Sequence, residues 1–230
     1  MSVIKKRMGG LRISYRPEGA DAIVLNTVFT HNRYGFPDDM SDMVVIDIGA
    51  HIGSATMLCA SRGATVFSFE PIRENYVLLE RNVKANKLDA HVFQNAVGRP
   101  GARTIYGNPG NSASNGEYML AAPTDNFFEE DVIWLTLGSI FANNNIAHCD
   151  FLKIDCEGSE IDVIPQIVDL RDQIDIVVGE IHSGMWPVPT PELDAMIDAA
   201  AASLDEFYTR EEISAHEYRW RKKPSYTQPA

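Results

Sequence analysis

The strongest indication of the fold of this chain is the segment Val44-Val-Ile-Asp47-Ile-Gly49-Ala-His51-Ile-Gly53. Residues 44–48 form a short, mostly apolar run, which is typical of a strand that is buried on both faces of a sheet. Glycines follow it, and residues 53–62 then have the length and pattern of a helix that ends at Gly63. A buried strand that leads through a glycine turn into a helix indicates the first unit of an α/β domain.

The same alternation of strands and helices continues along the chain. Further strands are expected at residues 65–70, 91–96, 150–155 and 175–181, and helices at residues 74–86, 136–143, 159 onward and 190–204. Residues 206–210 and 217–222 are typical of a closing antiparallel pair. The pattern predicts an α/β fold with a Rossmann-like, doubly wound sheet of seven strands, mostly parallel, with helices on both faces.

Two segments depart from this rhythm. Residues 1–42 are expected to form an N-terminal extension that packs on the domain of residues 43–230. Within it, Leu11–Tyr15 and Ala22–Leu25 are interpreted as the strands of a hairpin around a glycine turn. Residues 98–131 are rich in Gly, Asn, Pro and Ser, which predicts a hairpin and a mobile loop inserted near the active site.

Composition restricts the class of partner. The 230 residues carry a formal net charge of -12, with 45% hydrophobic and 23% charged residues. These values are ordinary for a globular domain, and the average field of such a chain repels nucleic acids and anionic membrane surfaces. We therefore expect a small-molecule acceptor, with no nucleic acid or membrane as partner. Composition leaves homo-oligomerisation open.

The cysteines indicate the cellular compartment. Cys59, Cys149 and Cys156 are the three cysteines, and their odd number and irregular spacing fit neither a disulfide framework nor a paired zinc motif. The basic residues near the start are not followed by the apolar run of a signal peptide, and no apolar stretch reaches the length of a membrane span. These features predict reduced thiols in a cytoplasmic protein.

The turn after the first strand lies where ligands bind in open α/β sheets, beyond the carboxyl ends of the strands. Gly49 and Gly53 allow the backbone to turn sharply and to approach a ligand closely. Asp47 places a carboxylate at the strand end, where it can hold a cationic amino group directly or through water. His51 lies in the same loop and is a candidate lining residue of the pocket.

Two later strand ends supply the rest of a nucleoside site. Glu70 follows Gly49 by 21 residues and ends the second strand, where a carboxylate can accept hydrogen bonds from both hydroxyls of a ribose. Asn95 and Ala96 end the third strand and are suitably placed to meet an adenine edge. These residues predict a pocket for a ligand that contains adenosine.

An NAD site is the competing interpretation, because it also uses an acid at the second strand. That site requires G-x-G-x-x-G, whereas the spacing here is G-x-x-x-G and His51 stands where the middle glycine should be. A ligand with adenosine at one end and an amino acid at the other fits better than a dinucleotide.

Three motifs carry a resemblance to a known family. They are Asp47-Ile-Gly-Ala-His-Ile-Gly53, Phe69-Glu-Pro71 and the most specific, Leu152-Lys-Ile-Asp-Cys-Glu-Gly-Ser-Glu160. With them the chain resembles the FkbM family of methyltransferases from about Met43 to Glu180, and Arg16–Tyr34 is similar to the N-terminal segment usual in that family. The resemblance implies binding of S-adenosylmethionine and O-methylation of natural-product or sugar hydroxyls. At Leu137-Gly138 the chain lacks an aspartate that relatives often have after the leucine.

Ionisable groups end the fourth and fifth strands, which should lie side by side. Methyl transfer to a hydroxyl requires a base, and we predict that Asp155 or His182 serves as the base and that Glu180 orients the imidazole. The alternative is that Asp155, Glu180 and His182 ligate a divalent cation that acidifies the hydroxyl. Mixed carboxylate and histidine ligands suit Zn²⁺ or Fe²⁺ better than Mg²⁺ or Mn²⁺.

Other positions and activities stay open at this point. Glu160 is interpreted as a residue that stabilises the positive end of the following helix. Tyr34 and residues 111–114 are candidates for a lid over cofactor or acceptor, and Trp186 packs either on substrate or in the core. Methyl transfer to nitrogen, or a module that binds S-adenosylmethionine without catalysis, are alternatives on the same scaffold.

Overall fold

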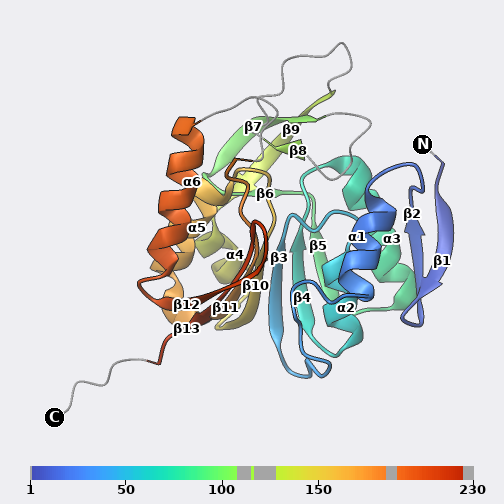
Figure 1. Ribbon diagram of the computed structural model, residues 1–230. Coiled ribbons are helices and arrows are strands. Elements are labelled where there is room, and N and C mark those ends of the chain that lie inside the picture. Colours follow the sequence, from blue (N-terminus) through green and yellow to red (C-terminus); the bar gives the residue numbers. More distant parts are fainter. Residues whose placement is uncertain (1, 108–114, 117–127, 185–190, 225–230) are drawn as a thin grey trace.

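A seven-stranded sheet forms the centre of the computed structural model, which describes residues 2–107, 115–116, 128–184 and 191–224 (Figure 1). Its strands, in spatial order, are β12 (Tyr208–Ser214), β13 (Glu217–Lys222), β11 (Ile174–Glu180), β10 (Cys149–Ile154), β3 (Val44–Ile48), β4 (Thr65–Phe69) and β5 (Ala90–Phe93). Neighbours from β11 to β5 pair in parallel, and β13 pairs antiparallel with both β11 and β12. This topology confirms the predicted doubly wound α/β fold, with its switch point between β3 and β10.

Helices cover both faces of the sheet (Figure 1). One face carries α1 (Asp21–Phe29), α2 (Ser54–Ser61) and α3 (Arg73–Asn86), and the other carries α4 (Leu137–Asn143), α5 (Glu160–Asp169) and α6 (Pro191–Leu204), with the short helix η1 (Arg171–Gln173) before β11. Side chains of β3 alternate between them, because Val45 packs in the cluster beneath α1 and α2 whereas Ile46 packs in the cluster beneath α5 and α6. No helix in the described ranges combines the length and the apolar character needed to cross a membrane.

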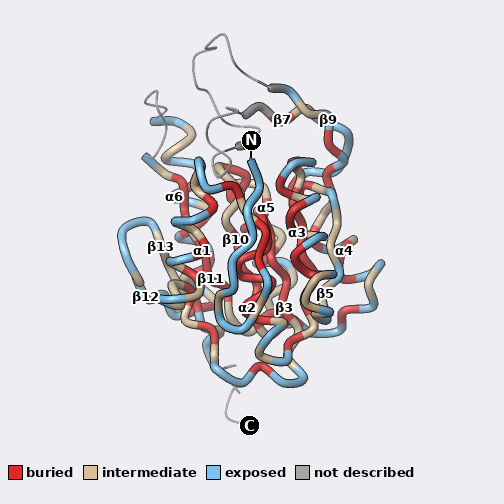
Figure 2. Tube along the Cα trace, turned by 90° about the vertical axis from the view of Figure 1, so that its right-hand side faces the viewer, coloured by how far each residue is buried: buried red, intermediate tan, exposed pale blue. Residues whose placement is uncertain are grey.

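The distribution of buried residues follows from this layering. Figure 2 shows buried positions gathered along the central strands and the inner sides of the helices, whereas the N-terminal hairpin is largely exposed. The apolar run of β3 is therefore explained by burial on both faces. Asp47 is the exception in that run, since it is a fully buried carboxylate.

The N-terminal segment differs in part from the prediction. A hairpin is present, but Leu11–Tyr15 (β2) pairs with Ile4–Met8 (β1). Residues 22–25 belong instead to α1, in which Leu25 and Val28 are buried on one side and Ile23 is exposed. An apolar run of four residues fits a strand or one turn of a half-buried helix equally well, so the run alone did not distinguish the two. The hairpin packs on α3 through paired hydrogen bonds between the backbone of Ser14 and the Asn82 amide.

A second, smaller sheet lies at the carboxyl ends of the central strands. Its order is β6 (Ala96–Val97), β9 (Phe128–Leu135), β7 (Gly101–Gly107) and β8 (Asn115–Gly116). β7 and β9 form an antiparallel pair that begins within the segment predicted as a hairpin. The predicted third strand of the central sheet ends early, because Ala96 leaves it to pair with Trp134 of β9. The candidate lid at 111–114 and Trp186 lie outside the described residues.

Candidate active site

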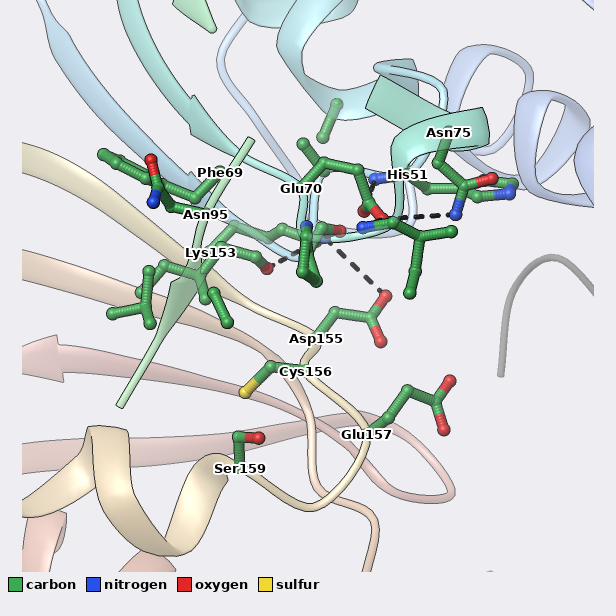
Figure 3. A pocket seen from close by; sticks show the side chains of 18 of the residues that line it. His51, Phe69, Glu70, Asn75, Asn95, Lys153, Asp155, Cys156, Glu157 and Ser159 are labelled. Atoms are coloured by element: carbon green, nitrogen blue, oxygen red, sulfur yellow. Dashed lines mark hydrogen bonds and ion pairs between the residues drawn. The ribbon is translucent and has the colours of Figure 1, made fainter. Parts of the chain in front are cut away.

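A cavity opens where β3, β4 and β10 end, bounded on one side by the smaller sheet (Figure 3). Seven of the residues predicted from the sequence line it, namely Tyr34, Gly49, His51, Glu70, Asn95, Ala96 and Asp155. Four others, Asp47, Gly53, Glu180 and His182, lie outside the described lining. The cavity coincides with the switch point of the sheet, where open α/β folds bind their ligands.

The turn after β3 needs glycine because two loops meet there. Gly49 has a φ of 73°, and a Cβ built on it would lie 1.8 Å from the backbone carbonyl oxygen of Asp155. No side chain fits in that space, so the turn after β3 touches the turn after β10 directly. Gly53 has another role, since its added Cβ would lie 2.6 Å from Leu79 Cδ1 of α3. It permits close packing of α2 on α3 and does not line the cavity.

Glu70 is fixed at the end of β4 with its carboxylate buried in the cavity wall. Its Oε2 accepts a hydrogen bond from the His51 backbone N–H at 2.8 Å, and its Oε1 accepts from the Ile72 backbone N–H at 3.0 Å and from Asn75 Nδ2 at 3.2 Å. Burial raises the pKa of Glu70, and these donors oppose that rise by favouring the ionised form. Figure 3 shows Glu70, His51 and Asn75 together on one side of the cavity.

Two buried polar groups in the cavity wall have no hydrogen-bond partner among the described residues. Ser54 Oγ and Trp134 Nε1 are buried, line the cavity, and make no hydrogen bond to any residue that the structure describes. A buried donor without a partner costs about 1–3 kcal/mol, so both groups suit a bound ligand that offers acceptors. Together with Glu70 and the glycine turn, these donors fit an adenosine-containing cofactor that ends in an amino acid.

Lys153 is a buried cation that sequence reasoning did not identify. It lies in register with Asp47 on the neighbouring strand, and its Nζ is 3.1 Å from Asp47 Oδ1 and donates to the Gly49 carbonyl oxygen at 2.6 Å. Asp47 Oδ2 also accepts a hydrogen bond from Thr56 Oγ1 at 2.7 Å. Asp47 therefore pairs with the ammonium group of Lys153, and through it supports the glycine turn. The signal was present in the sequence, because Lys153 is the cation inside the otherwise apolar end of β10.

Asp155 follows Lys153 and faces the cavity (Figure 3). Its Oδ2 accepts a hydrogen bond from the Tyr34 hydroxyl at 3.1 Å and lies 3.7 Å from Lys153 Nζ. Burial alone would raise the pKa of Asp155, but Lys153, His182 and Arg33 outweigh burial and hold that pKa below its usual range. The carboxylate is therefore ionised at neutral pH, and Tyr34 connects it to the N-terminal segment.

His182 is held by Glu160 rather than by Glu180. Its Nδ1 lies 2.9 Å from Glu160 Oε1, and its Nε2 lies 3.8 Å from Asp155 Oδ1 and 3.6 Å from Glu157 Oε2. Burial would lower the pKa of His182, but the surrounding carboxylates, Glu160 first, raise it to about 10. An imidazole in this setting is protonated at neutral pH and is a poor proton acceptor, which differs from the base predicted from the sequence.

Glu180 has a different partner because β11 ends at that residue. The prediction that Glu180 and His182 share a face required the strand to continue for two more residues, and it does not. Glu180 Oε2 instead accepts from Arg33 Nη2 at 3.0 Å, and Arg33 also pairs with Glu217. This ion-pair cluster attaches the segment around Tyr34 to the last strands of the sheet.

Glu157 completes the polar edge of the cavity. It lines the cavity, has a φ of 52°, and has a pKa that burial raises to about 8. One ligand atom from each of Asp155, Glu157 and His182 lies within 4.8 Å of the others. The set that the sequence predicted as metal ligands is thus changed, with Glu157 in the position expected for Glu180.

Comparison with known proteins agrees with the geometry of this site. The family model described as the methyltransferase FkbM domain matches residues 47–207, more than two thirds of the chain. The 31-O-demethyl-FK506 methyltransferase FkbM of Streptomyces tacrolimicus is 27% identical over 206 residues, covering 75% of this chain and 79% of that protein.

A second relative and a solved structure are also similar to the chain. The hexuronic acid methyltransferase AglP of Haloferax volcanii is 24% identical over 155 residues, covering 66% of this chain and only 61% of that protein. A crystal structure of a proposed rRNA methylase from Clostridium thermocellum superposes with a TM-score of 0.50 at 9% identity, covering 81% of this chain and 89% of the other. At that identity the structural likeness bears on the fold alone.

Proposed function

The chain belongs to the methyltransferase FkbM domain family, and from this premise we propose that it transfers a methyl group from S-adenosylmethionine to a hydroxyl of a small natural-product or sugar-type acceptor. The observation that carries the proposal is that Glu70, Asp155 and Glu157 open into one cavity at the switch point of the sheet. The first of these carboxylates suits a ribose, and the other two suit an acceptor hydroxyl.

S-adenosylmethionine supplies the methyl group, which its sulfonium sulfur activates for in-line displacement by the acceptor. Glu70 would accept hydrogen bonds from the ribose hydroxyls, because backbone donors already fix its carboxylate. Ser54 and Trp134 would donate to acceptors of the same ligand, since both donors are buried without partners among the described residues. Gly49 allows the turn after β3 to meet the turn after β10 in the wall of the cavity.

The acceptor hydroxyl must lose its proton during transfer, and Asp155 and Glu157 are the groups that promote that loss. Asp155, which is ionised at neutral pH, would accept the proton itself, or Asp155 and Glu157 would together hold a cation that acidifies the hydroxyl. Tyr34 and Lys153 keep the Asp155 carboxylate oriented toward the cavity, through one hydrogen bond and one ion pair. His182 is the cationic neighbour of both carboxylates.

Two observations support a small hydroxylated acceptor over other acceptors. The names of the two relatives place the methyl group on a hexuronic acid in one case and on an oxygen in the other. The net charge of -12 disfavours a polyanionic acceptor such as RNA. An amine acceptor is the second candidate, and it predicts a different product in the same assay.

The test is a methyl-transfer assay with labelled S-adenosylmethionine and a panel of hydroxylated sugars, uronic acids and polyketides beside matched amines. We expect label on a hydroxyl, and a turnover about 100-fold lower in Asp155→Asn with unchanged cofactor affinity. Asp198→Asn, an exposed carboxylate on α6, is the matched control and should keep full turnover. Label on amines alone would replace the O-methyltransferase assignment with an N-methyltransferase.

A further inference from the structure

Three side chains at the edge of the cavity are arranged as metal ligands are, in addition to any part they take in proton transfer. We propose that Asp155, Glu157 and His182 form a binding site for one divalent transition-metal cation. The role of this cation rests on the proposed function, whereas its binding is independent of it. Each residue offers one ligand atom, a carboxylate oxygen from two of them and Nε2 from the third, and all three atoms lie within 4.8 Å of one another.

The two separations from His182 match those of atoms that share a cation. His182 Nε2 is 3.8 Å from Asp155 Oδ1 and 3.6 Å from Glu157 Oε2. Two ligands that each lie about 2.1 Å from a metal ion, at an angle between about 110° and 130°, are separated by about 3.4–3.8 Å. Both distances also exceed the range of a good hydrogen bond, so His182 Nε2 is directed at two carboxylates without bonding to either.

His182 is presented in the way that ligating histidines are. Its Nδ1 lies 2.9 Å from Glu160 Oε1, which leaves Nε2 to face the two carboxylates. Glu160 is itself fully buried and accepts hydrogen bonds from the backbone N–H groups of Cys156 at 3.1 Å and Gly158 at 2.8 Å. A carboxylate that fixes the far nitrogen of a metal-binding imidazole, and is held in turn by other donors, is the usual second layer of such sites.

The groups that surround His182 are carboxylates, which are themselves ligands for a cation. Three carboxylates, from Asp155, Glu157 and Glu160, lie within 4 Å of the single imidazole. Of the neighbouring cations, Lys153 pairs with Asp155 at 3.7 Å but lies closer to Asp47, and Arg33 pairs with Glu180 and Glu217. A ligating imidazole is neutral, so a bound divalent ion would displace the proton that His182 carries and would take its place as the positive charge among the carboxylates.

The ligand set indicates the kind of metal. Carboxylate oxygens suit Mn²⁺ and an imidazole nitrogen suits Zn²⁺ or Fe²⁺, so a mixed set favours a transition metal over Mg²⁺ or Ca²⁺. Because Asp155 and Glu157 line the cavity, the cation would face the acceptor. The acceptor oxygen would bind it and release its proton to solvent more readily. The methyl carbon then bonds to that oxygen, the carbon–sulfur bond breaks, and the sulfur keeps the electron pair.

A second group of candidate ligands in the described residues provides a control. His148, Asp150 and Asp175 also lie within 4.8 Å of one another, but His148 Nε2 is 3.0 Å from Asp175 Oδ2 at a half-exposed surface. Asp150 Oδ2 accepts a hydrogen bond from the backbone N–H of Val44. Asp175→Asn therefore removes a carboxylate of the same kind from the alternative site and leaves the proposed one intact.

The experiment is a titration of the metal-free full chain with Mn²⁺, followed by the electron paramagnetic resonance signal of the free ion and repeated with Zn²⁺ by calorimetry. We expect one ion per chain, at least tenfold weaker binding in Glu157→Gln and His182→Gln, and wild-type binding in Asp175→Asn. Glu160→Gln should weaken binding by about 10- to 100-fold, as expected when an outer partner of the imidazole is lost. Melting curves and S-adenosylmethionine affinity, measured for each variant, show that the fold is retained.

Several results would overturn the proposal. They are the absence of saturable binding of either ion by the wild-type chain, binding that Glu157→Gln and His182→Gln leave unchanged, and binding that Asp175→Asn abolishes. Methyl transfer that persists undiminished in chelator would remove the cation from the reaction while leaving the proposed function intact. A chain that binds Mn²⁺ at this site but not S-adenosylmethionine would refute the proposed function and keep the site.

Discussion

Replacement of Lys153 by methionine should be among the most damaging single changes in the central sheet. The substitution keeps the apolar stem but removes an ammonium group that lies 3.1 Å from Asp47 Oδ1 and donates to the Gly49 carbonyl oxygen at 2.6 Å. Asp47 is then a fully buried carboxylate without its cation. Breaking a buried ion pair from one side costs about 3–5 kcal/mol, because the remaining charge is left uncompensated.

The loss is large relative to the whole stability of a domain, which is about 5–15 kcal/mol. With a urea dependence of about 3 kcal/mol per molar for a chain of this size, the unfolding midpoint of Lys153→Met should fall by about 1–1.5 M. The double variant Asp47→Asn, Lys153→Met removes both charges and keeps an acceptor for Thr56 Oγ1. It should lose only about 1–2 kcal/mol, which is less than either single variant loses, so the two positions should show a favourable coupling energy.

Urea unfolding followed by circular dichroism, on the wild-type chain, the two single variants and the double variant, measures that coupling directly. Two results would contradict this role of Lys153: a loss of less than about 1 kcal/mol in Lys153→Met, or a double variant that is less stable than Lys153→Met alone. Either result would mean that the buried pair does not depend on charge compensation and that Lys153 does not stabilise the glycine turn.

Three further changes test separate contacts. Gly49→Ala places a Cβ within 1.8 Å of the Asp155 carbonyl oxygen. It should lower the free energy of unfolding in urea by about 2–4 kcal/mol and abolish cofactor binding, and a normal melting curve would contradict this. Tyr34→Phe removes the hydroxyl that donates to Asp155 and should lower kcat/KM about tenfold with an unchanged melting temperature, so unchanged kinetics would count against that contact. Burial raises the pKa of Asp21, but His51 and Arg16 outweigh it and lower that pKa, so its stabilisation is present above about pH 4 and is lost as the pH falls. The difference in unfolding free energy between the wild-type chain and Asp21→Asn should therefore shrink below that pH, and a constant difference would refute the assignment.

The frame of the fold could be predicted because its signals are local. The apolar run before Gly49 is buried on both faces of the sheet, and a chain that alternates such runs with helices has few other ways to fold. The acid at the end of the second strand was predictable for the same reason, since Glu70 follows Gly49 at a fixed interval set by one strand–helix–strand unit.

The partners of the site residues could not be predicted, because they depend on where strands end and on contacts between distant segments. Glu180 was expected beside His182, but β11 ends at Glu180 and its carboxylate turns to Arg33 of the N-terminal segment. Glu160 was interpreted through its own helix, whereas it also reaches an imidazole 22 residues later in the chain. A spacing rule carries no information about such pairings.

Lys153 shows a further limit of predicting strands from the pattern of apolar residues. A charged residue within an apolar strand suggests an exposed strand edge or an error in the predicted strand, unless its partner is known. Here the partner is Asp47, the other charge within an apolar strand, and the parallel register of β3 and β10 brings the two together. The two charges that interrupt the apolar pattern of their strands therefore form one buried ion pair.

The most direct test of the central claim is calorimetric titration of the full chain with S-adenosylmethionine and with its demethylated product. We expect micromolar binding of both compounds, weakened at least about tenfold in Glu70→Gln because the ribose loses a charged acceptor. Glu74→Gln, an exposed carboxylate in the first turn of α3, should bind as tightly as the wild-type chain. Absence of binding by either compound, or binding that Glu70→Gln leaves unchanged, would contradict the assignment of this cavity.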